Sequence, residues 1–378
     1  MAVLADFALE TYFSKWEFTA RFHLSASDAQ SLSLRELLSM AGTEDAEAFN
    51  ALWLGYTETL GSPPLREEIA STYSNQTADN ILCFAGAEEG IFIAMHALLG
   101  KGDHAIVVTP NYQAAETVPL SLCEVTGVPL DPDRSWSLDI DLVARSIRPN
   151  TKLISINFPH NPTGKILEHD KLTALVALCR KHGLWLFSDE VYRLLGLHPE
   201  RQLPQVADIY ERGLSLNVMS KAYGLSGLRI GWIASSDRAL LIRMERFKHY
   251  LSICNSAPSE LLARIALKNR ARILARNNQL LADNIVLLEA FFEEFESLFQ
   301  WYNPDGGCVA YPRYLGSDSV DVFTQNLVER AGVLLLPATV YRSELGATPT
   351  DRFRIGYGRA GLGLGLEAFR RHLQGNLS

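Results

Sequence analysis

Short apolar runs alternate with a helical pattern through the middle of this chain of 378 residues. The runs are short and mainly apolar, and the first is ended by Pro110, which is typical of buried strands. The runs cover residues 103–109, 152–158, 183–189, 214–219 and 230–234, and a helical pattern fills 171–182. Parallel strands need crossovers of this length, so the pattern predicts an α/β fold with a mostly parallel central sheet covered by helices on both faces.

Three polar side chains lie at or just after the ends of these strands. Asn161 follows the run 152–158, Asp189 closes the next run, and Lys221 follows the run 214–219. Ligands of open parallel sheets bind beyond the carboxyl ends of the strands. The positions therefore favour one shared site over three unrelated surface turns.

The length of the chain predicts two lobes, because single hydrophobic cores stop growing at roughly 250 to 300 residues. A long helical pattern over 258–298 is expected to connect them, and short strand patterns follow. We predict a large domain over 46–284. Residues 1–45 and 285–378 would form a smaller α+β domain, with the N-terminal segment folded back onto the C-terminal lobe.

The charge and the cysteines narrow the functional classes. The net charge of −8, with no basic stripe to offset it, argues against nucleic acid as a partner. The five cysteines are scattered and show no zinc-binding spacing, so we predict reduced thiols and no metal. The N-terminus lacks a basic signal-peptide region and no apolar run reaches the roughly 18 residues of a membrane span, which predicts a cytoplasmic protein without a membrane partner.

The segment 220–229, Ser-Lys-Ala-Tyr-Gly-Leu-Ser-Gly-Leu-Arg, places a lysine directly after a strand. A lysine whose pKa is lowered by burial or by a nearby cation is an amine nucleophile that forms Schiff bases. Taken alone, Lys221 is more often a solvated lysine in a surface turn. Likewise, Asp189 alone is more often a helix N-cap, and Asn161 in Asn-Pro-Thr-Gly a turn residue.

Together and in this order, these residues resemble the fold-type I pyridoxal 5'-phosphate (PLP) enzymes, specifically the class I and II aminotransferase family, from about Tyr56 to Arg354. The resemblance implies PLP as cofactor. Lys221 would attach it and later remove the α proton of a bound amino acid. Asp189 would pair with the ring nitrogen, and Tyr192 and Asn161 with the ring oxygen.

The same resemblance implies the remaining cofactor contacts. Main-chain N–H groups at the start of a helix would hold the phosphate, an aromatic ring would stack on the cofactor, and a hydroxyl and a guanidinium would complete the phosphate site. These residues are Gly86, Ala87, Glu88, Tyr112, Ser220 and Arg229. Val218 departs from the pattern, because the family usually carries Ser or Thr three positions before the lysine.

Two further residues are assigned through the resemblance. Tyr56 would reach the phosphate of a neighbouring subunit, which implies a homodimer with shared active sites. Arg354 would hold the α-carboxylate of the substrate, since its planar fork suits bidentate contact with a carboxylate. Its apolar neighbours Phe353 and Ile355 argue against a surface salt bridge.

The scaffold alone does not choose the reaction. Transamination and elimination followed by ring closure both begin with loss of the α proton. The motifs at 158–162, 220–225, 306–307, 310–314 and 332–337 and the opening at 9–13 resemble those of a cyclase of this family that acts on a hydroxylated arginine. This resemblance favours a cyclase by a narrow margin, while Tyr192 counts against it. Ordinary transamination with a 2-oxo acid stays open.

A guanidinium side chain would require carboxylates in the site. The candidates are Glu10, Glu17, Asp28, Glu88 and Glu116, of which we favour Glu10 and Asp28. A PLP-fold regulator or a scaffold without catalysis is the alternative from another class. No segment offers the room or the charge for a DNA-binding domain, and Lys221, Asp189 and Arg354 are all retained.

Overall fold

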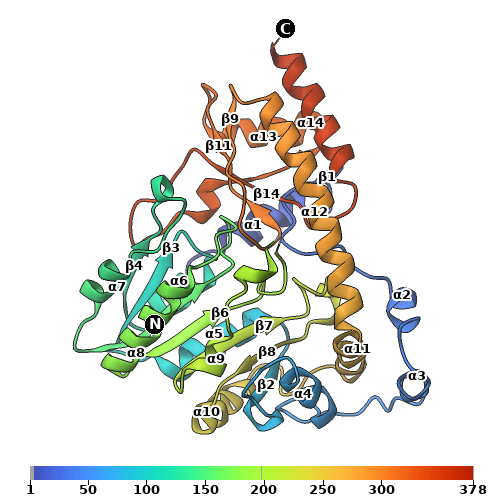
Figure 1. The fold of residues 1–378 in the computed structure, drawn as a ribbon, viewed down its shortest axis with the longest axis vertical. Helices are drawn as coiled ribbons and strands as arrows, with labels where there is room; N and C mark the ends of the chain where they lie inside the picture. Colours follow the sequence, from blue (N-terminus) through green and yellow to red (C-terminus); the bar gives the residue numbers. More distant parts are fainter. Residues whose placement is uncertain (1–3, 197, 378) are drawn as a thin grey trace.

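The computed structural model describes residues 4–196 and 198–377. Its centre is a seven-stranded sheet with the order β2-β8-β7-β6-β5-β3-β4 (Figure 1). The strands are β2 Ile81–Phe84, β3 His104–Thr109, β4 Glu124–Pro129, β5 Thr151–Asn157, β6 Trp185–Asp189, β7 Gly213–Val218 and β8 Gly231–Ala234. Strands β4, β3, β5, β6 and β7 run parallel to one another, and β8 runs antiparallel to its two neighbours, β7 and β2. The predicted α/β class with a mostly parallel sheet is confirmed.

Helices cover both faces of this sheet. They are α4 Pro63–Ala70, α5 Ala87–Leu98, α6 Ala114–Leu120, α7 Ile140–Ser146, α8 His169–His182, α9 Val206–Ile209 and α10 Arg238–Lys248. Successive strand residues point to opposite faces. Phe187 of β6 packs in one apolar cluster with Ile91 of α5, whereas Leu186 packs in another with Leu175 of α8. The sheet is therefore the buried middle layer and its strand ends are held firmly.

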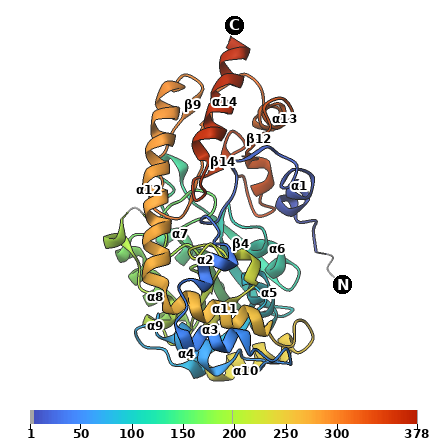
Figure 2. The same cartoon turned by 90° about the vertical axis from the view of Figure 1, so that its right-hand side faces the viewer.

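The predicted helical pattern over 258–298 forms two helices rather than one. They are α11 Ala257–Lys268 and α12 Arg270–Glu294, and they meet at Asn269. Helix α12 runs from the sheet toward the C-terminal lobe (Figures 1 and 2). The predicted boundary between the large and the small domain, at residue 284, falls inside this helix. The division into these two domains stays a prediction.

The C-terminal lobe consists of short strands and two helices. They are β9 Phe299–Gln300, β10 Val309–Ala310, β11 Arg313–Tyr314, α13 Val320–Ala331, β12 Val333–Leu334, β13 Leu336–Pro337, β14 Phe353–Gly356 and α14 Leu362–Leu377. Single 3₁₀ turns occur throughout the chain at η1 Ala78–Asn80, η2 Pro132–Arg134, η3 Pro199–Arg201, η4 Ser226–Leu228 and η5 Ala338–Tyr341.

The N-terminal segment divides between the two parts of the molecule. Helix α1 Ala8–Trp16 packs against η5, and β1 Phe22–His23 pairs in parallel with β12 (Figure 2). Helices α2 Leu34–Leu38 and α3 Thr43–Asn50 pack against α11 instead. Only the first part of the segment thus lies on the C-terminal lobe.

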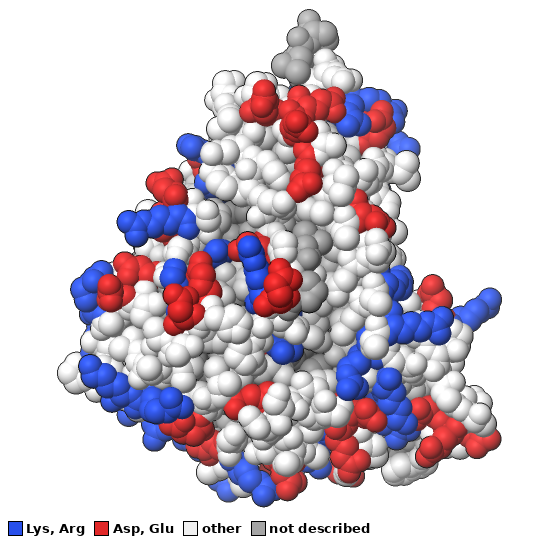
Figure 3. Space-filling model, in the orientation of Figure 1, with Lys and Arg blue, Asp and Glu red and all other residues white. Residues whose placement is uncertain are grey.

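Acidic and basic side chains are interspersed on the face of the molecule that Figure 3 shows, and this face is hollowed near its centre. Among the described residues, none of the helices is both long and apolar enough to cross a membrane.

Candidate active site

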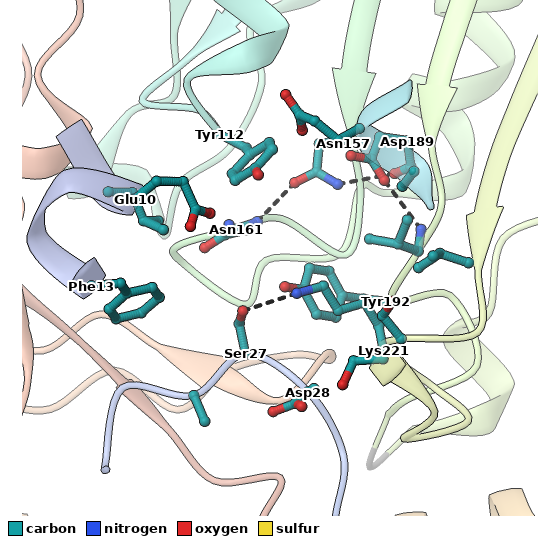
Figure 4. Close-up of a pocket in the computed structure, with 18 of the residues that line it drawn as sticks. Glu10, Phe13, Ser27, Asp28, Tyr112, Asn157, Asn161, Asp189, Tyr192 and Lys221 are labelled. Atoms are coloured by element: carbon teal, nitrogen blue, oxygen red, sulfur yellow. Dashed lines mark hydrogen bonds between the residues drawn. The ribbon is translucent and has the colours of Figure 1, made fainter. Parts of the chain in front are cut away.

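A cavity of about 320 Å³ lies at the carboxyl ends of β5, β6 and β7, beside the start of α5. Helix α1, the segment after β1 and strand β14 close its other side (Figure 4). Most of the predicted site residues line it: Glu10, Asp28, Ala87, Glu88, Tyr112, Asn161, Asp189, Tyr192, Ser220, Lys221, Arg229 and Arg354. Val218 lines it as well. Strand-end residues far apart in sequence are thus brought into one site.

Lys221 lies just beyond β7 and its amine points into the cavity. Its Nζ donates a hydrogen bond to Ser27 Oγ at 3.0 Å and lies 5.7 Å from the centre of the Tyr192 ring. Burial lowers the pKa of Lys221, and the cation of Arg354 acts in the same direction, although Asp28 opposes both. The surroundings therefore favour the neutral, nucleophilic amine.

Asp189 ends β6 next to Asn157, the last residue of β5. The Asn157 amide donates to the Asp189 carbonyl at 3.0 Å and accepts from the Asn161 N–H at 2.9 Å (Figure 4). The Asp189 carboxylate accepts from the Val191 N–H at 3.2 Å. Burial nevertheless raises the pKa of Asp189 to about 6. A cationic N–H donor in the cavity would compensate for this burial.

The start of α5 and Arg229 form an anion-binding corner. Gly86 has a φ of 95°, and a Cβ at this position would lie 2.3 Å from Arg229 Nη2. A Cβ at Gly231 would lie 2.9 Å from the Ala87 nitrogen, so β8 passes directly beneath the loop. Arg229 donates to the Ser226 carbonyl at 3.2 Å and forms no ion pair within residues 4–196 and 198–377. Main-chain N–H groups at the start of a helix, together with a guanidinium that forms no ion pair in the described part of the chain, suit a phosphate.

Arg354 is a buried guanidinium without a carboxylate partner among the residues that the structure describes. It is 1% exposed and donates to the Asn161 side-chain oxygen at 3.2 Å, the Tyr341 hydroxyl at 2.6 Å and the Ser25 carbonyl at 2.6 Å. Its Nε has no partner in the described structure. Since a buried charge with only neutral partners is costly, the residue suits an anionic ligand.

A sequence model of the family "Aminotransferase class I and II" matches residues 27–362. The chain belongs to this family. It is 28% identical to capreomycidine synthase of Streptomyces vinaceus over 98% of this chain and 93% of that protein.

Two solved structures have the same fold over nearly their whole length. A PLP-dependent aminotransferase from Streptococcus suis 89-1591 is 28% identical with a TM-score of 0.91, and 98% of each chain is covered. The PLP-dependent cyclase OrfR is 25% identical with a TM-score of 0.89, again over 98% of each chain. This aminotransferase-family chain is therefore a PLP-dependent enzyme of fold type I.

The cavity of this family member fits PLP on its own chemistry. Lys221 offers an amine of lowered pKa, Asp189 a buried carboxylate and Arg229 a guanidinium, and neither Asp189 nor Arg229 forms an ion pair among the described residues. These groups would meet the aldehyde, the ring nitrogen and the phosphate. The hydroxyl that Val218 lacks has a candidate replacement in Ser226, which lines the same cavity beside Arg229.

Glu10 and Glu17 line the cavity from α1 and its C-terminal end, opposite the strand ends. Burial, and to a lesser degree Glu10, raise the pKa of Glu17. Burial raises the pKa of Glu88 to about 7, against a hydrogen bond from Tyr112 that lowers it. The cavity therefore has an acidic side near α1.

Two of the carboxylates predicted to bind a guanidinium, Asp28 and Glu116, are not free in the cavity as Glu10 is. Asp28 lines the cavity but already binds Arg359 in a bidentate pair, with both N–O distances 2.8 Å. Glu116 lies outside the cavity, because it accepts from the Ser343 hydroxyl and the Glu344 N–H, both at 2.7 Å. The candidacy of Glu116 is wrong, and a substrate could use Asp28 only in competition with Arg359.

Tyr56 also lies outside the cavity, and 86% of its surface is exposed. Within a single chain it contacts no part of the site. Its predicted contact with the phosphate of a neighbouring subunit stays a prediction.

Sequence reasoning missed several residues in or beside the cavity, among them Phe13, His23, Ser27, Asn157, Ser226, Tyr341 and Arg359. The position of Asn157 at a strand end was a usable signal. Ser27, Tyr341 and Arg359 carry no local pattern, since they reach the site only through the packing of the N-terminal segment and the C-terminal lobe.

Proposed function

We propose that the cavity binds PLP and a free amino acid. Lys221 would attach the cofactor, Asp189 would face its ring nitrogen, and Tyr192 and Asn161 its ring oxygen. The start of α5 with Ser220, Ser226 and Arg229 would hold the phosphate, and Tyr112 would lie against the ring. PLP, when bound, supplies an electron-withdrawing ring that makes the α proton of an attached amino acid acidic.

Two residues of the chain then bind the substrate and accept its α proton. Lys221 accepts the α proton at Nζ, which the lowered pKa of its amine favours. Arg354 holds the α-carboxylate through its forked N–H groups. The carboxylate thereby supplies a negative partner for this buried guanidinium. These two contacts fix the amino acid with its Cα–H directed to the base.

We infer that the substrate side chain carries a guanidinium group. The observation that carries this inference is the pair of carboxylates, Glu10 and Glu17, seven positions apart on one side of α1 and both in the cavity. Seven residues are close to two helical turns, so the two side chains lie on one face. Asp28, which also lines the cavity, is neutralised by Arg359.

We propose elimination and intramolecular cyclisation of a hydroxylated arginine as the reaction. The substrate loses its α proton and its side-chain hydroxyl as water, a guanidino nitrogen bonds to the carbon that carried the hydroxyl, and a proton returns to Cα. The net change is the loss of one water. The likeness to capreomycidine synthase and to the cyclase OrfR supports this reaction.

Transamination is the second candidate, because the aminotransferase from Streptococcus suis is as similar as the cyclases. Incubation with arginine and with hydroxyarginine, each with and without a 2-oxo acid and followed by mass analysis, separates the two. A product that forms without an oxo acid and lacks one water supports cyclisation. A 2-oxo product that requires the added oxo acid supports transamination.

We further propose a homodimer in which Tyr56 reaches the site of the partner subunit. Several large apolar side chains are exposed in two segments, Trp53, Leu54, Tyr56 and Tyr250 among them. Thr57 joins these segments, since its hydroxyl donates to the Asn255 carbonyl at 2.9 Å. Exposed apolar patches mark interfaces. Light scattering on the purified protein tests the dimer, and a monomer at working concentration would contradict it.

A further inference from the structure

Ser27 is the one side chain within hydrogen-bonding distance of the Lys221 amine in the described structure. Its Oγ accepts from Lys221 Nζ at 3.0 Å and it lines the cavity (Figure 4). Tyr192 lines the same cavity, and the centre of its ring lies 5.7 Å from Lys221 Nζ. The Ser27 hydroxyl and the Tyr192 ring therefore both lie close to the predicted base.

The backbone fixes this hydroxyl in place. The Ala29 N–H donates to the Lys221 carbonyl at 3.1 Å, and the Gln30 N–H donates to the Gly358 carbonyl at 2.7 Å. Gly224 leaves room for this close approach, because a Cβ there would lie 2.6 Å from the Gln30 carbonyl oxygen. The segment that carries Ser27 is thus anchored both to the loop that carries Lys221 and to the C-terminal lobe.

We propose that Ser27 is a catalytic residue that aims the free Lys221 amine and stabilises the ammonium group formed when this amine takes the α proton. The inference rests on the proposed function, since it requires Lys221 to be the base. Only one proton moves, from Cα to Nζ, and the electron pair of the C–H bond stays with the substrate. The role is the same for cyclisation and for transamination, because both begin with this proton transfer.

The chemistry of the contact supports a role in proton transfer rather than in packing. A hydrogen bond from an ammonium to a hydroxyl is stronger than one from a neutral amine, so Ser27 stabilises the product of the transfer more than its reactant. Tyr192 stays a neutral phenol because burial raises its pKa, so it adds no charge beside Ser27 and Lys221. The other charged or titratable groups that influence Lys221 are Asp28, Cys308, Arg354, Asp189 and Glu17.

The first test measures exchange of the α proton of arginine with solvent deuterium by NMR in the PLP-loaded protein. Ser27→Ala should slow the exchange roughly 10- to 100-fold, the range expected for one hydrogen bond to a charged group. Ser27→Thr keeps a hydroxyl and should restore most of the rate. Ser31→Ala removes an exposed hydroxyl of the same segment and should leave the rate unchanged.

The second test follows the visible absorption that appears when PLP-free protein captures PLP, as a function of pH. Capture needs the neutral amine. Ser27 favours the ammonium form, so Ser27→Ala should move the midpoint of the pH dependence downward by roughly one to two units. A merely structural role would change the extent of capture without moving its midpoint.

The outcomes separate this inference from the function on which it rests. If the unaltered protein captures no PLP, the proposed function fails. If it captures PLP but Ser27→Ala matches it in exchange rate and in midpoint, the inference about Ser27 alone is overturned. Ser27→Thr that behaves like Ser27→Ala would also overturn it.

Discussion

The two walls of the cavity differ in how the chain builds them. The sheet wall consists of Asn161, Asp189, Lys221 and the start of α5. These residues lie at or just after the ends of buried strands, so the packed sheet positions them directly. The lobe wall, made of α1, the segment 26–28 and β14, combines pieces that are distant in sequence. Ser27 and Lys221 are 194 positions apart, and Asp28 and Arg359 are 331 apart.

The walls also differ in their charges. On the sheet wall, Asp189 and Arg229 form no ion pair within the described residues, so both remain available to a ligand of opposite charge. On the lobe wall, Asp28 is already neutralised by Arg359. The sheet wall is thus prepared for the cofactor. Selection of the substrate depends on lobe-wall charges that form no close ion pair among the described residues, Arg354 and Glu10, and on Glu17, whose carboxylate lies 3.9 Å from His23 Nε2.

The largest effect is expected on the sheet wall. Lys221→Ala removes the amine that would attach PLP and accept the α proton, so turnover should fall by at least about 1000-fold and the visible absorption of the PLP-loaded protein should be lost. Absorbance and rate measurements check this. A variant that keeps the visible band would show that another group attaches the cofactor.

On the lobe wall, Arg354→Ala should weaken amino acid binding by about 100-fold, because the carboxylate loses its buried partner. Arg354→Lys keeps the charge without the fork and should lie between this variant and the unaltered protein. Spectral titration with arginine and with PLP measures both affinities. If the affinity for PLP falls as much as the affinity for the amino acid, the division into a cofactor-binding sheet wall and a substrate-binding lobe wall is wrong.

The pH dependence of stability sharpens the contrast in charge. Asp189 has a folded-state pKa of about 6 against an ordinary value of 3.8, so the folded PLP-free protein holds the proton more tightly than the unfolded chain. Its stability should therefore fall by about 2 kcal/mol as the pH rises from about 4 to above 6. Asp189→Asn should match the unaltered protein near pH 4 and exceed it near pH 8 in urea unfolding without PLP. Equal stabilities at both pH values would contradict the burial of an uncompensated carboxylate.

Substrate selection by α1 is expected to give a smaller effect. Glu10→Gln and Glu17→Gln should each raise KM for a guanidino amino acid by about 10-fold more than KM for a neutral one, since each removes one charged contact to the side chain. Glu44→Gln, on the exposed surface of α3, is the matched control. Equal changes for both substrates would remove the guanidinium assignment.

The smallest expected effect concerns the departure at Val218. Ser226→Ala should weaken PLP binding by about 5-fold, the value of one hydrogen bond to the phosphate. Val218→Ser in the same chain should restore the affinity, because it returns the hydroxyl usual in the family. Absorbance titration with PLP checks both variants. An unchanged PLP affinity of Ser226→Ala would show that Ser226 does not replace the hydroxyl that is absent at Val218.

The strand pattern by itself predicted five of the seven strands of the sheet, without β2 and β4, and the meeting of three polar side chains at one edge. The other cofactor contacts were assigned through the family resemblance. Alternating strands and helices admit few topologies, and parallel strands bring their carboxyl ends to one edge. Asn161, Asp189 and Lys221 were therefore expected to lie together, and they do line one cavity. The break at Asn269 was not predicted, since both helices continue a similar apolar spacing across it.

Only the tertiary structure decided the partners of the lobe-wall residues. Asp28 and Glu116 look like free carboxylates in the sequence, yet one binds Arg359 and the other holds the loop at Ser343. Ser27 carries no motif and reaches Lys221 because the N-terminal segment packs across the loop after β7. Local periodicity fixes strands and helices, whereas contacts between segments hundreds of residues apart depend on how their surfaces pack.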